Sequence, residues 1–501
     1  MRGSILALLA AATAVGLTLA APTAAPPPSL PDDVARGERL FSKGMCGGCH
    51  GAAGVYPVGP SMVGPPLIGP KWKYGGDAQS IFNSIHDGRP LWMKAKGGMD
   101  LSDDQIRDIV AYIKYRERTA TPEERAIALE RTPAGPPAGV VHSAVQDFRV
   151  ETVAKTYLPY AFDFLPDGRI LISETGGTLR IVDHGKLLTD PVAGAPMGDT
   201  TGMDGWMSRA NMSVAVHPNF KNNGWVYLLT ARHAAKPAPT GAPDIATIWR
   251  GRLVGNRWLD NRKILEFPME GPDSHRMKFD RQGDLYVGTV GAHGGYTGVG
   301  AAKTPAQTLS SAEGKILRIR DDGSVPPDNP FVSTPGAYPY IWSLGHREPS
   351  GLTFDGNGEL WNVEDGEHGG DELNHVRKGH NYGWPAITWG HPYLEVSVVS
   401  RTDRMGMEPA VAVWTPSPAV SDVEWYGGSA FPAWRGSFFV GTMKQRDVYR
   451  VTVDGDRETL REVVLHNVDR IRDIATGPDG LIYILTDGGD LLRLVPADKK
   501  E

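Results

Sequence analysis

The chain has 501 residues, and 52 Lys and Arg against 58 Asp and Glu give it a formal net charge of −6. This balance provides no basic surface for a nucleic-acid partner. The length leaves room for more than one domain, and 61 Gly with 40 Pro favour a turn-rich β protein over a helical one.

The N-terminus has the composition of a secretory signal peptide. Arg2 precedes an apolar run from Ile5 to Ala20, and a Pro-rich segment follows over 22–30. We assign the signal peptide to 1–21; no Ala-x-Ala site marks its end, and the alternative is an uncleaved anchor, for which the run is short. We expect a periplasmic protein with no stable membrane span after cleavage.

Residues 46–50 read Cys-Gly-Gly-Cys-His, and Cys46 and Cys49 are the only cysteines of the chain. Cys-x-x-Cys-His is the attachment signature of haem c, in which both thiols bond to the haem and His50 becomes an axial ligand of the iron. A redox Cys-x-x-Cys would need a βαβ context, and a zinc site would need two further ligands. We therefore expect haem c, and with it one-electron transfer.

Helical patterns surround this motif. A helix with acidic residues in its first turn is predicted to begin at Pro31. A second helix is capped by the segment 101–105, and its apolar stripe consists of Ile106, Ile109, Val110 and Ile113. Residues 31–118 resemble a small, all-α class I cytochrome c domain.

A Met thioether is the usual sixth iron ligand of such domains. Residues 88–93 resemble the ligand loop of the family, which favours Met93. Met99 and Met62 are the alternatives, and each Met could equally serve the core.

Residues 119–145 have the composition of a linker, with a short helix predicted from Thr121. Beyond it, a turn with glycine followed by an apolar strand occurs six times, at Gly168, Gly224, Gly283, Gly358, Gly436 and Gly480. Most copies are followed by another strand. The repeats predict an all-β six-bladed β-propeller over 146–496, with a pair of β-sandwiches as the alternative.

Four motifs in this region carry a family resemblance, at 345–352, 364–366, 370–374 and 381–385. Together they resemble the soluble glucose/sorbosone dehydrogenases, six-bladed propellers that bind pyrroloquinoline quinone (PQQ) and calcium. The resemblance runs from about residue 150 to residue 495, and its central block is the specific part.

PQQ is a tricarboxylate quinone, so it needs cations for its carboxylates and a Lewis acid at its quinone oxygens. The resemblance implies that the cations are Arg347, Lys444, Arg470 and Arg472. The i, i+2 spacing of Arg470 and Arg472 directs both side chains to one face of a strand. A solvated surface role is the alternative for any one of them.

The resemblance also implies calcium. The ion beside PQQ would bind the carbonyl oxygens of Gly366 and Glu367, the second of which replaces the usual Pro. A structural calcium would bind Glu372 and the Tyr382 carbonyl, since hard oxygen ligands in a Gly-rich acidic loop suit this ion. An acidic turn without an ion is the alternative.

The proton-abstracting pair of the family is not in place. Its base is a His four residues before an Arg that matches Arg276, and Pro272 stands there instead. The Asp that orients this base falls near Gly291. Two positions beside Arg347 also differ, with Glu348 for the usual Asn and Ser350 for the usual Gln.

Three explanations of these departures stay open. His275 or His293 acts as the base, since a neutral imidazole suits proton abstraction near pH 7. Another group such as Glu348 serves a substrate other than an aldose. Or the propeller binds without catalysis.

We expect a periplasmic PQQ- and calcium-dependent dehydrogenase that oxidises a sugar, sugar aldehyde or alcohol. Its haem c would pass the electrons to a soluble cytochrome or a terminal oxidase. The alternatives are a calcium-dependent lactonase-like propeller, which needs no anion-binding cations, and a non-catalytic propeller that serves an electron-transfer cytochrome.

Overall fold

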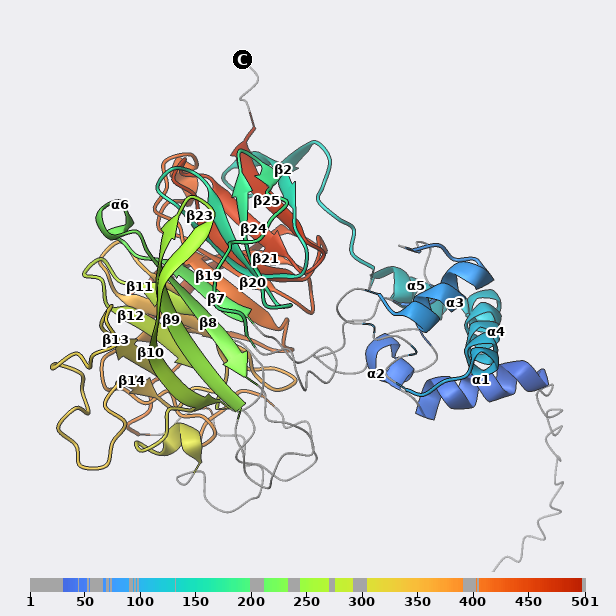
Figure 1. Cartoon of the computed structure of the whole chain (residues 1–501), viewed down its shortest axis with the longest axis horizontal. Helices are drawn as coiled ribbons and strands as arrows, with labels where there is room; N and C mark the ends of the chain where they lie inside the picture. The colour runs from blue at the N-terminus through green and yellow to red at the C-terminus, as the bar shows by residue number, and fades with distance from the viewer. Residues whose placement is uncertain are drawn as a thin grey trace, which may run out of the picture.

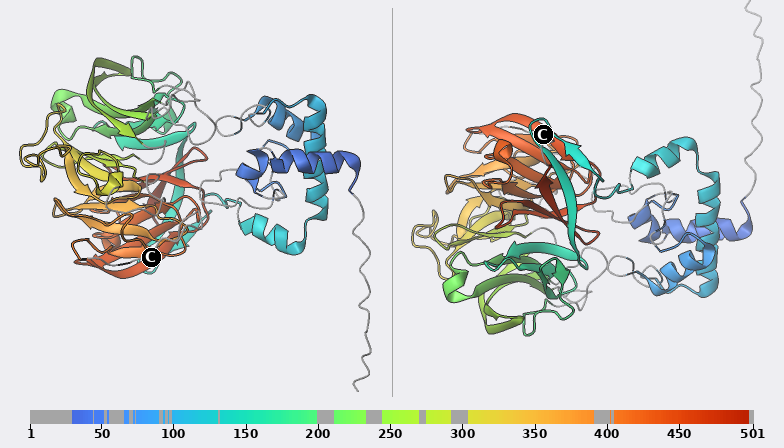
Figure 2. Two further views of the ribbon diagram at one scale, coloured as in Figure 1. Left: turned by 90° about the horizontal axis from the view of Figure 1, so that it is seen from below. Right: turned by 90° about the horizontal axis from the view of Figure 1, so that it is seen from above.

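The computed structural model describes a helical domain and a β-propeller, which lie side by side (Figure 1; two further views in Figure 2). The residues described are 30–43, 45–51, 54, 66–68, 72, 74–89, 93, 96, 99–130, 132–198, 211–232, 244–269, 275–291, 304–390, 402 and 405–497. Within them, no helix combines the length and the apolar character that crossing a membrane requires.

The described part of the helical domain contains five helices: α1 (Asp32–Lys43), α2 (Met45–His50), α3 (Ala78–Asp87), α4 (Asp103–Thr119) and α5 (Pro122–Glu130). The predicted capping box is present, because Ser102 and Gln105 each bond the other's backbone N–H. The predicted apolar stripe of α4 is buried in the core of this domain. Gly37 lets α1 cross α4 closely, since a Cβ at Gly37 would lie 1.9 Å from the Asp108 carbonyl oxygen.

The propeller has six antiparallel sheets. Blade 1 consists of β3 (Pro159–Phe164), β4 (Ile170–Glu174), β5 (Leu179–Asp183) and β6 (Lys186–Leu187). Blade 2 consists of β7 (Asn211–Val216), β8 (Trp225–Arg232), β9 (Asp244–Val254) and β10 (Arg257–Met269), with the short α6 (Phe220–Asn223). Blade 3 consists of β11 (Met277–Phe279), β12 (Leu285–Thr289), β13 (Lys315–Ile319) and β14 (Ile341–Leu344).

Blade 4 consists of β15 (Pro349–Phe354), β16 (Leu360–Glu364), β17 (Asp371–Val376) and β18 (Ala412–Trp414). Blade 5 consists of β19 (Val420–Trp425), β20 (Phe438–Thr442), β21 (Val448–Asp454) and β22 (Arg457–Leu465). Blade 6 has five strands, β23 (Ile471–Thr476), β24 (Ile482–Thr486), β25 (Asp490–Pro496), β2 (Asp147–Lys155) and β1 (Val140–His142). Short 3-10 turns occupy Pro305–Gln307 and Pro432–Trp434.

The six predicted turns are confirmed, because each leads into the second strand of a blade. Their glycines all have left-handed φ angles, between 67° and 95°. A residue with a Cβ adopts this conformation at a cost, so glycine is the natural choice at each of these turns.

The last blade closes the ring with strands from both ends of the propeller. β2 pairs with β25 from Phe148 opposite Pro496 to Lys155 opposite Asp490. Phe148 is fully buried against Trp434, with ring centroids 5.2 Å apart. This packing fixes the closing strand against blade 5 as well as blade 6.

The innermost strands of successive blades are joined by hydrogen bonds around the central channel. The Asp163 carboxylate accepts from the Val216 N–H at 2.7 Å, and that of Asp473 accepts from the Phe162 N–H at 2.7 Å. Buried backbone N–H groups need partners, and side chains of the neighbouring blade provide them here. The channel wall is therefore polar and hydrogen-bonded.

Candidate functional site

One end of the channel is marked by Arg276, which lies just before β11. Its guanidinium donates to the carbonyl oxygens of Ser350 and Tyr160, each at 3.1 Å, and to that of Arg472. These three residues lie at the starts of β15, β3 and β23, so the starts of these innermost strands lie close together. We call this end the cofactor end, because the four predicted PQQ cations lie there.

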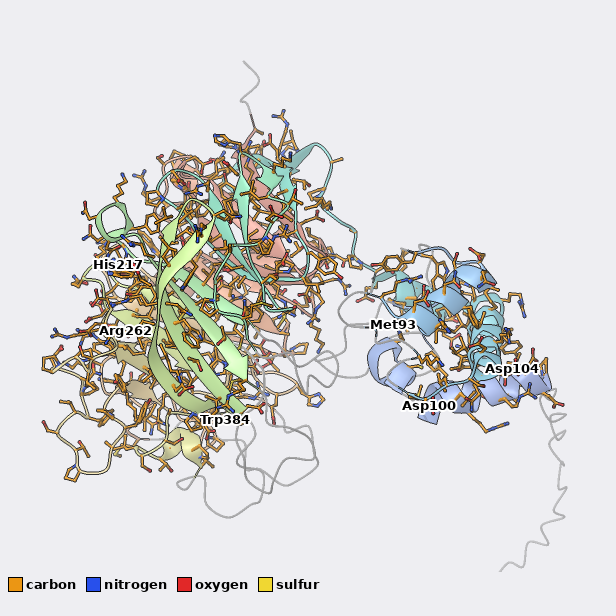
Figure 3. All side chains as sticks on the ribbon, viewed as in Figure 1. Met93, Asp100, Asp104, His217, Arg262 and Trp384 are labelled. Carbon is orange, nitrogen blue, oxygen red and sulfur yellow. The ribbon has the colours of Figure 1, made fainter. Side chains whose placement is uncertain are left out.

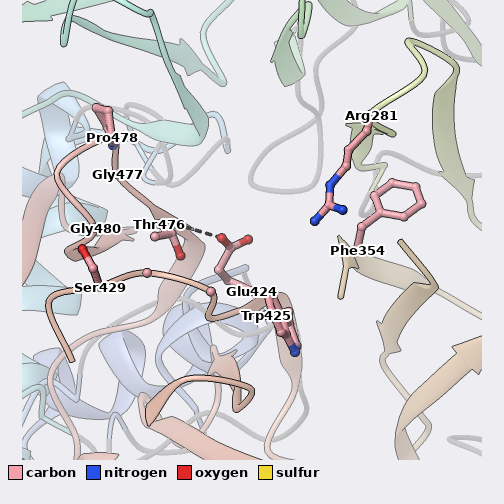
Figure 4. Close-up of a pocket in the computed structure, with 11 residues that line it drawn as sticks. Arg281, Phe354, Glu424, Trp425, Ser429, Thr476, Gly477, Pro478 and Gly480 are labelled. Carbon is pink, nitrogen blue, oxygen red and sulfur yellow. Dashed lines mark hydrogen bonds between the residues drawn. The ribbon is translucent and has the colours of Figure 1, made fainter. Parts of the chain in front are cut away.

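The opposite end holds a pocket of about 440 Å³ (Figure 4). Its wall includes Arg281 and Phe354 on one side and Trp425 and Thr476 on the other, all at or just beyond the ends of innermost strands. No predicted site residue lines it, so the candidate site lies elsewhere.

At the cofactor end, two guanidiniums share one carboxylate. Arg470 donates to Asp487 Oδ2 at 2.7 Å, and Arg472 donates to both oxygens of Asp487. Burial alone would raise the pKa of Asp487, yet Arg472 and Arg470 together hold it below its usual range. These three side chains carry one positive charge in excess, which suits an anionic ligand. The carboxyl group of Asp469, whose pKa is raised to about 6 mainly by burial, interacts with Asp487 and Arg470 and offsets this charge when it is ionised.

Lys444 follows β20 in the loop that leads to β21. Its backbone N–H donates to the Pro418 carbonyl at 2.9 Å, and its side chain is half-buried. Within the part of the chain that the structure describes, the ammonium group has no hydrogen-bond or ion-pair partner. It is therefore available to a carboxylate.

Arg347 is surrounded by acidic groups. Its guanidinium lies 3.4 Å from Glu348, 3.5 Å from the Asp365 carboxylate and 3.7 Å from Glu367. It also donates to the Asp365 carbonyl and lies over the ring of Trp384, 5.6 Å from its centroid. Arg347 thus neutralises an acidic loop, and only part of its charge is left for a cofactor.

The predicted calcium ligands lie in this loop and in the strands on either side of it. The Gly366 N–H donates to the Asp371 carboxylate at 3.1 Å, and Glu367 is buried. Glu372 lies directly opposite Glu364 on the neighbouring strand, and Asn374 donates to both. Burial, opposed by hydrogen bonds from neighbouring groups, raises the pKa of Glu364 to about 7.

Tyr382 is connected to Glu364 through the ring of His346. The His346 ring stacks on the Tyr382 ring with centroids 4.7 Å apart, and its Nδ1 lies 3.2 Å from Glu364. Burial lowers the pKa of His346 to about 3, so this imidazole is neutral and compensates no carboxylate. The carboxylates of this region outnumber its cations, and a divalent ion fits that imbalance.

Within the described ranges, no three His, Cys, Asp or Glu side chains are grouped so as to hold a metal ion. The predicted calcium ligands include the carbonyl oxygens of Gly366, Glu367 and Tyr382, which such a side-chain grouping leaves out.

Of the candidate bases, the structure describes Glu348, which lies 3.4 Å from Arg347, and His275, which directly precedes Arg276. His275 is buried, 1% exposed, with its ring 6.2 Å from that of Phe267 in β10. His293 and Pro272 lie outside the described residues. Ser350 is buried between blades, where its hydroxyl donates to the Val420 carbonyl at 3.0 Å.

Gly291 leaves no room for the orienting Asp of the family. A Cβ there would lie 2.6 Å from the Gly314 Cα and 3.0 Å from the His346 carbonyl oxygen. The Gly291 N–H donates to the Arg347 carbonyl at 2.8 Å, and Trp384 donates to the Gly291 carbonyl at 3.0 Å. The backbone itself fills the position that a side chain would need.

The haem motif occupies α2, which carries Cys46, Cys49 and His50; the Cys49 side chain lies outside the description. Cys46 packs against the core of the helical domain, as do Met93 and Met99, so both candidate thioethers lie by the same core. Met62 is not among the described residues. Figure 3 shows Met93 on the side of this domain that faces the propeller.

Sequence reasoning missed two residues of this site. Asp487 pairs with Arg470 and Arg472, and Glu364 opposes Glu372. Glu364 stands in one of the motifs that carry the family resemblance, so this acidic motif could have indicated it as a site residue. Asp487 lies in a generic turn after β24, where nothing in the sequence marks it.

The comparisons with known proteins agree with this architecture. The model of the family described as "Glucose / Sorbosone dehydrogenase" matches residues 156–493, and that of "Cytochrome C oxidase, cbb3-type, subunit III" matches residues 32–113. An aldose sugar dehydrogenase of Escherichia coli is 34% identical over 351 residues, which cover 68% of this chain and 90% of that protein.

A quinoprotein glucose dehydrogenase B of Acinetobacter calcoaceticus is 28% identical over 408 residues, covering 66% of this chain and 83% of that one. The apo crystal structure of the soluble aldose sugar dehydrogenase of Escherichia coli superposes with a TM-score of 0.60 at 32% identity, over 70% of this chain and 100% of that one. The chain therefore belongs to the glucose/sorbosone dehydrogenase family, with a cbb3-type cytochrome c domain ahead of its propeller.

Proposed function

We propose that this protein is a periplasmic PQQ- and calcium-dependent dehydrogenase. It would oxidise a sugar, sugar aldehyde or alcohol and pass the electrons through its own haem c to a soluble cytochrome or a terminal oxidase. The observation that carries the proposal is the pairing of Arg470 and Arg472 with the single carboxylate of Asp487, which leaves positive charge at the cofactor end. The similarity to a quinoprotein glucose dehydrogenase supports the same cofactor.

In this proposal each residue has a defined task. Lys444, Arg470 and Arg472 would hold the carboxylates of PQQ, with Arg347 at the border of the acidic loop. The Gly366 and Glu367 carbonyls would hold calcium beside them, and Glu372 with the Tyr382 carbonyl would hold the second ion. PQQ with calcium supplies an electrophilic quinone that takes up the two electrons of the substrate.

A base of the chain must take the proton of the substrate hydroxyl group. We propose His275 or His293 for this step, with Glu348 as the third candidate because it lies beside Arg347. The side chain of His275 is buried, so it would act as the base only if its imidazole became accessible to the substrate.

The cytochrome domain would act as the built-in electron acceptor. Cys46 and Cys49 would bond to the haem, and His50 and Met93 would ligate its iron. Because both domains belong to one chain, the haem is present at a high effective concentration near the propeller.

The test is haem reduction by the intact protein. Protein carrying haem c is mixed with PQQ, calcium and one candidate substrate at a time, and the haem α-band is followed. Reduction that needs all three additions supports the dehydrogenase. No reduction with any sugar, sugar aldehyde or alcohol, while dithionite still reduces the haem, contradicts it.

A non-catalytic propeller is the second candidate, and the closed backbone at Gly291 favours it. Calorimetry with PQQ and calcium separates the two candidates, because the dehydrogenase must bind PQQ, whereas a non-catalytic propeller does not need to. Absence of PQQ binding would favour this second candidate.

A further inference from the structure

The segment after α5 is attached to the propeller by backbone hydrogen bonds. The Ala134 N–H donates to the Asn467 carbonyl at 2.7 Å, and the Gly135 N–H donates to the Val468 carbonyl at 3.0 Å. These bonds join the stretch between the domains to the loop that enters β23. The path of the chain out of the cytochrome domain is therefore defined.

Two side chains of the propeller hold the preceding residues. Arg446 Nη2 donates to the Glu130 carbonyl at 2.7 Å, and Asn467 Nδ2 donates to the Thr132 carbonyl at 3.0 Å. The two side chains also bond each other, since Arg446 Nε donates to Asn467 Oδ1 at 2.6 Å. We call Arg446 and Asn467 the linker clamp.

The backbone of the clamp is held in an uncommon conformation. Arg446 has φ 62° and Asn467 has φ 50°, both in the left-handed region. Non-glycine residues adopt this region at an energetic cost, which is smaller for Asn, and persist there where surrounding contacts determine them. The bonds to the linker are among those contacts.

The clamp belongs to the loops that carry the candidate PQQ cations. Arg446 is two residues after Lys444, and Asn467 is three residues before Arg470. The two loops are joined directly, because the Val468 N–H donates to the Arg446 carbonyl at 3.0 Å. The linker is thus fixed at the cofactor end of the propeller.

The side of the cytochrome domain that carries Met93 faces the propeller (Figure 3). The Arg89 N–H donates to the Met93 carbonyl at 2.7 Å, and the Arg89 guanidinium lies over the Tyr74 ring, 5.0 Å from its centroid. Tyr157 lies two residues before β3 in the propeller, and partial burial, then the phenol of Tyr74 and the carboxyl of Glu174, raise its pKa. This interaction agrees with a position of Tyr74 near the start of β3.

We propose that Arg446 and Asn467 are positioning residues for electron transfer between the domains. They hold the linker so that the Met93 side of the cytochrome domain stays over the cofactor end of the propeller. The inference rests on the proposed function. One hydroxyl oxidised to a carbonyl releases two electrons and two protons, and each electron reduces Fe(III) haem to Fe(II), so two haem reductions, with reoxidation by an external one-electron acceptor between them, balance one turnover.

The test uses the full-length protein with haem, PQQ and calcium, and two variants of the clamp. Arg446→Ala removes the donor to Glu130. Asn467→Asp keeps the acceptor for Arg446 but removes the donor to Thr132. Arg457→Ala is the matched control, because this exposed Arg of the same blade contacts only the exposed Asp454 among the described ion pairs.

Three quantities are measured for each protein: turnover with a small diffusible dye, the rate of haem reduction by substrate, and hydrogen exchange of the Ala134 and Gly135 amides. We expect both clamp variants to keep their dye turnover and to exchange these amides faster. Their haem reduction should slow by about tenfold or more, the order of loss when a positioned reaction loses its geometry. The control should match the wild type in all three.

Haem reduction at the wild-type rate, despite faster exchange, would overturn the inference, and so would unchanged exchange in both variants. Loss of dye turnover together with haem reduction would also overturn it, since the clamp would then act on the cofactor end itself. If the wild type reduces neither dye nor haem, the proposed function fails, and electron transfer between the domains fails with it.

Discussion

Glu364 and Glu372 face each other directly across the β16–β17 ladder, with Glu364 buried and Glu372 partly buried. Like charges in this position destabilise a sheet. Burial, followed by the charge of Glu364, raises the pKa of Glu372 well above its usual range. The folded state is therefore more stable when a carboxyl group of this pair keeps its proton or when the pair binds a cation.

The first prediction is a pH-dependent effect of calcium on stability. The pKa of Glu364 is raised to about 7 and that of Asp371 to about 6, both mainly by burial. The stabilising protons are fully bound below the unfolded pKa of roughly 4 and are lost as the pH rises through 6 to 7. Without calcium, the melting temperature of the propeller should fall over this window, and calcium should raise it more at pH 8 than at pH 5.

Glu372→Gln tests the same pair by removing one charge. At pH 8 without calcium it should raise the melting temperature by roughly 1–2 °C, the shift that a stabilisation of about 1 kcal/mol produces in a domain of this size. It should also reduce the gain from calcium. Glu359→Gln, at an exposed position before β16, is the control, and an equal calcium effect in all three proteins would contradict the prediction.

The second prediction separates the two arginines that share Asp487. The Arg470 side chain is 16% exposed and that of Arg472 is 3% exposed. Replacing either by Ala should weaken PQQ binding in calorimetry by about tenfold or more, because a charge-assisted hydrogen bond contributes roughly 1.5–3 kcal/mol. Arg472→Ala should in addition lower the melting temperature, since it leaves more of Asp487 buried without a partner.

Arg493→Ala is the control for this pair, because Arg493 contacts Glu151 on the outer strands of the same blade. If the control weakens PQQ binding as much as the other two variants, the assignment of the cations is wrong.

The third prediction concerns the sixth iron ligand. Met93→Leu removes the thioether and should lower the reduction potential of the haem, since Met ligation raises it. Met99→Leu should leave the potential near that of the wild type, although both side chains pack against the same core. A redox titration that shows the opposite pattern would assign the ligand to Met99.

The fourth prediction addresses the missing catalytic Asp. Gly291→Asp should not create a catalytic pair. It should destabilise the propeller by about 1–3 kcal/mol, because a Cβ would lie 2.6 Å from the Gly314 Cα and overpacking carries this cost. Gly176→Ala is the control, as nothing lies within 4 Å of a Cβ there. A stable Gly291→Asp protein with increased dye turnover would show that the loop opens.

Local patterns made much of the fold predictable. The turns with glycine predicted the second strand of every blade, and Ser102 with Gln105 predicted the start of α4. Both signals act within a few residues of chain. The helix α3 was not predicted, although Asp77 caps it by accepting from the Ser80 N–H.

Contacts between distant segments were not predictable in the same way. Asp473 bonds the backbone of Phe162 only because the ring brings blades 6 and 1 together. Asp487 reaches Arg470 and Arg472 because β23 and β24 pair within blade 6. The family resemblance indicated the cations, since their motifs are local. It did not indicate the acidic partners that determine how much of each charge is left for a ligand.

The closure of blade 6 has a consequence for how the protein is made. β2 is synthesised early and pairs with β1, but its other edge stays open until β25 emerges, because β25 is the last strand of the ring. Exposed edges favour wrong pairing, so the propeller is open to misassembly until its last strand has formed. Among the described residues, the main core cluster of the helical domain contains no propeller residue, so this domain can form its core while the propeller is still an open chain.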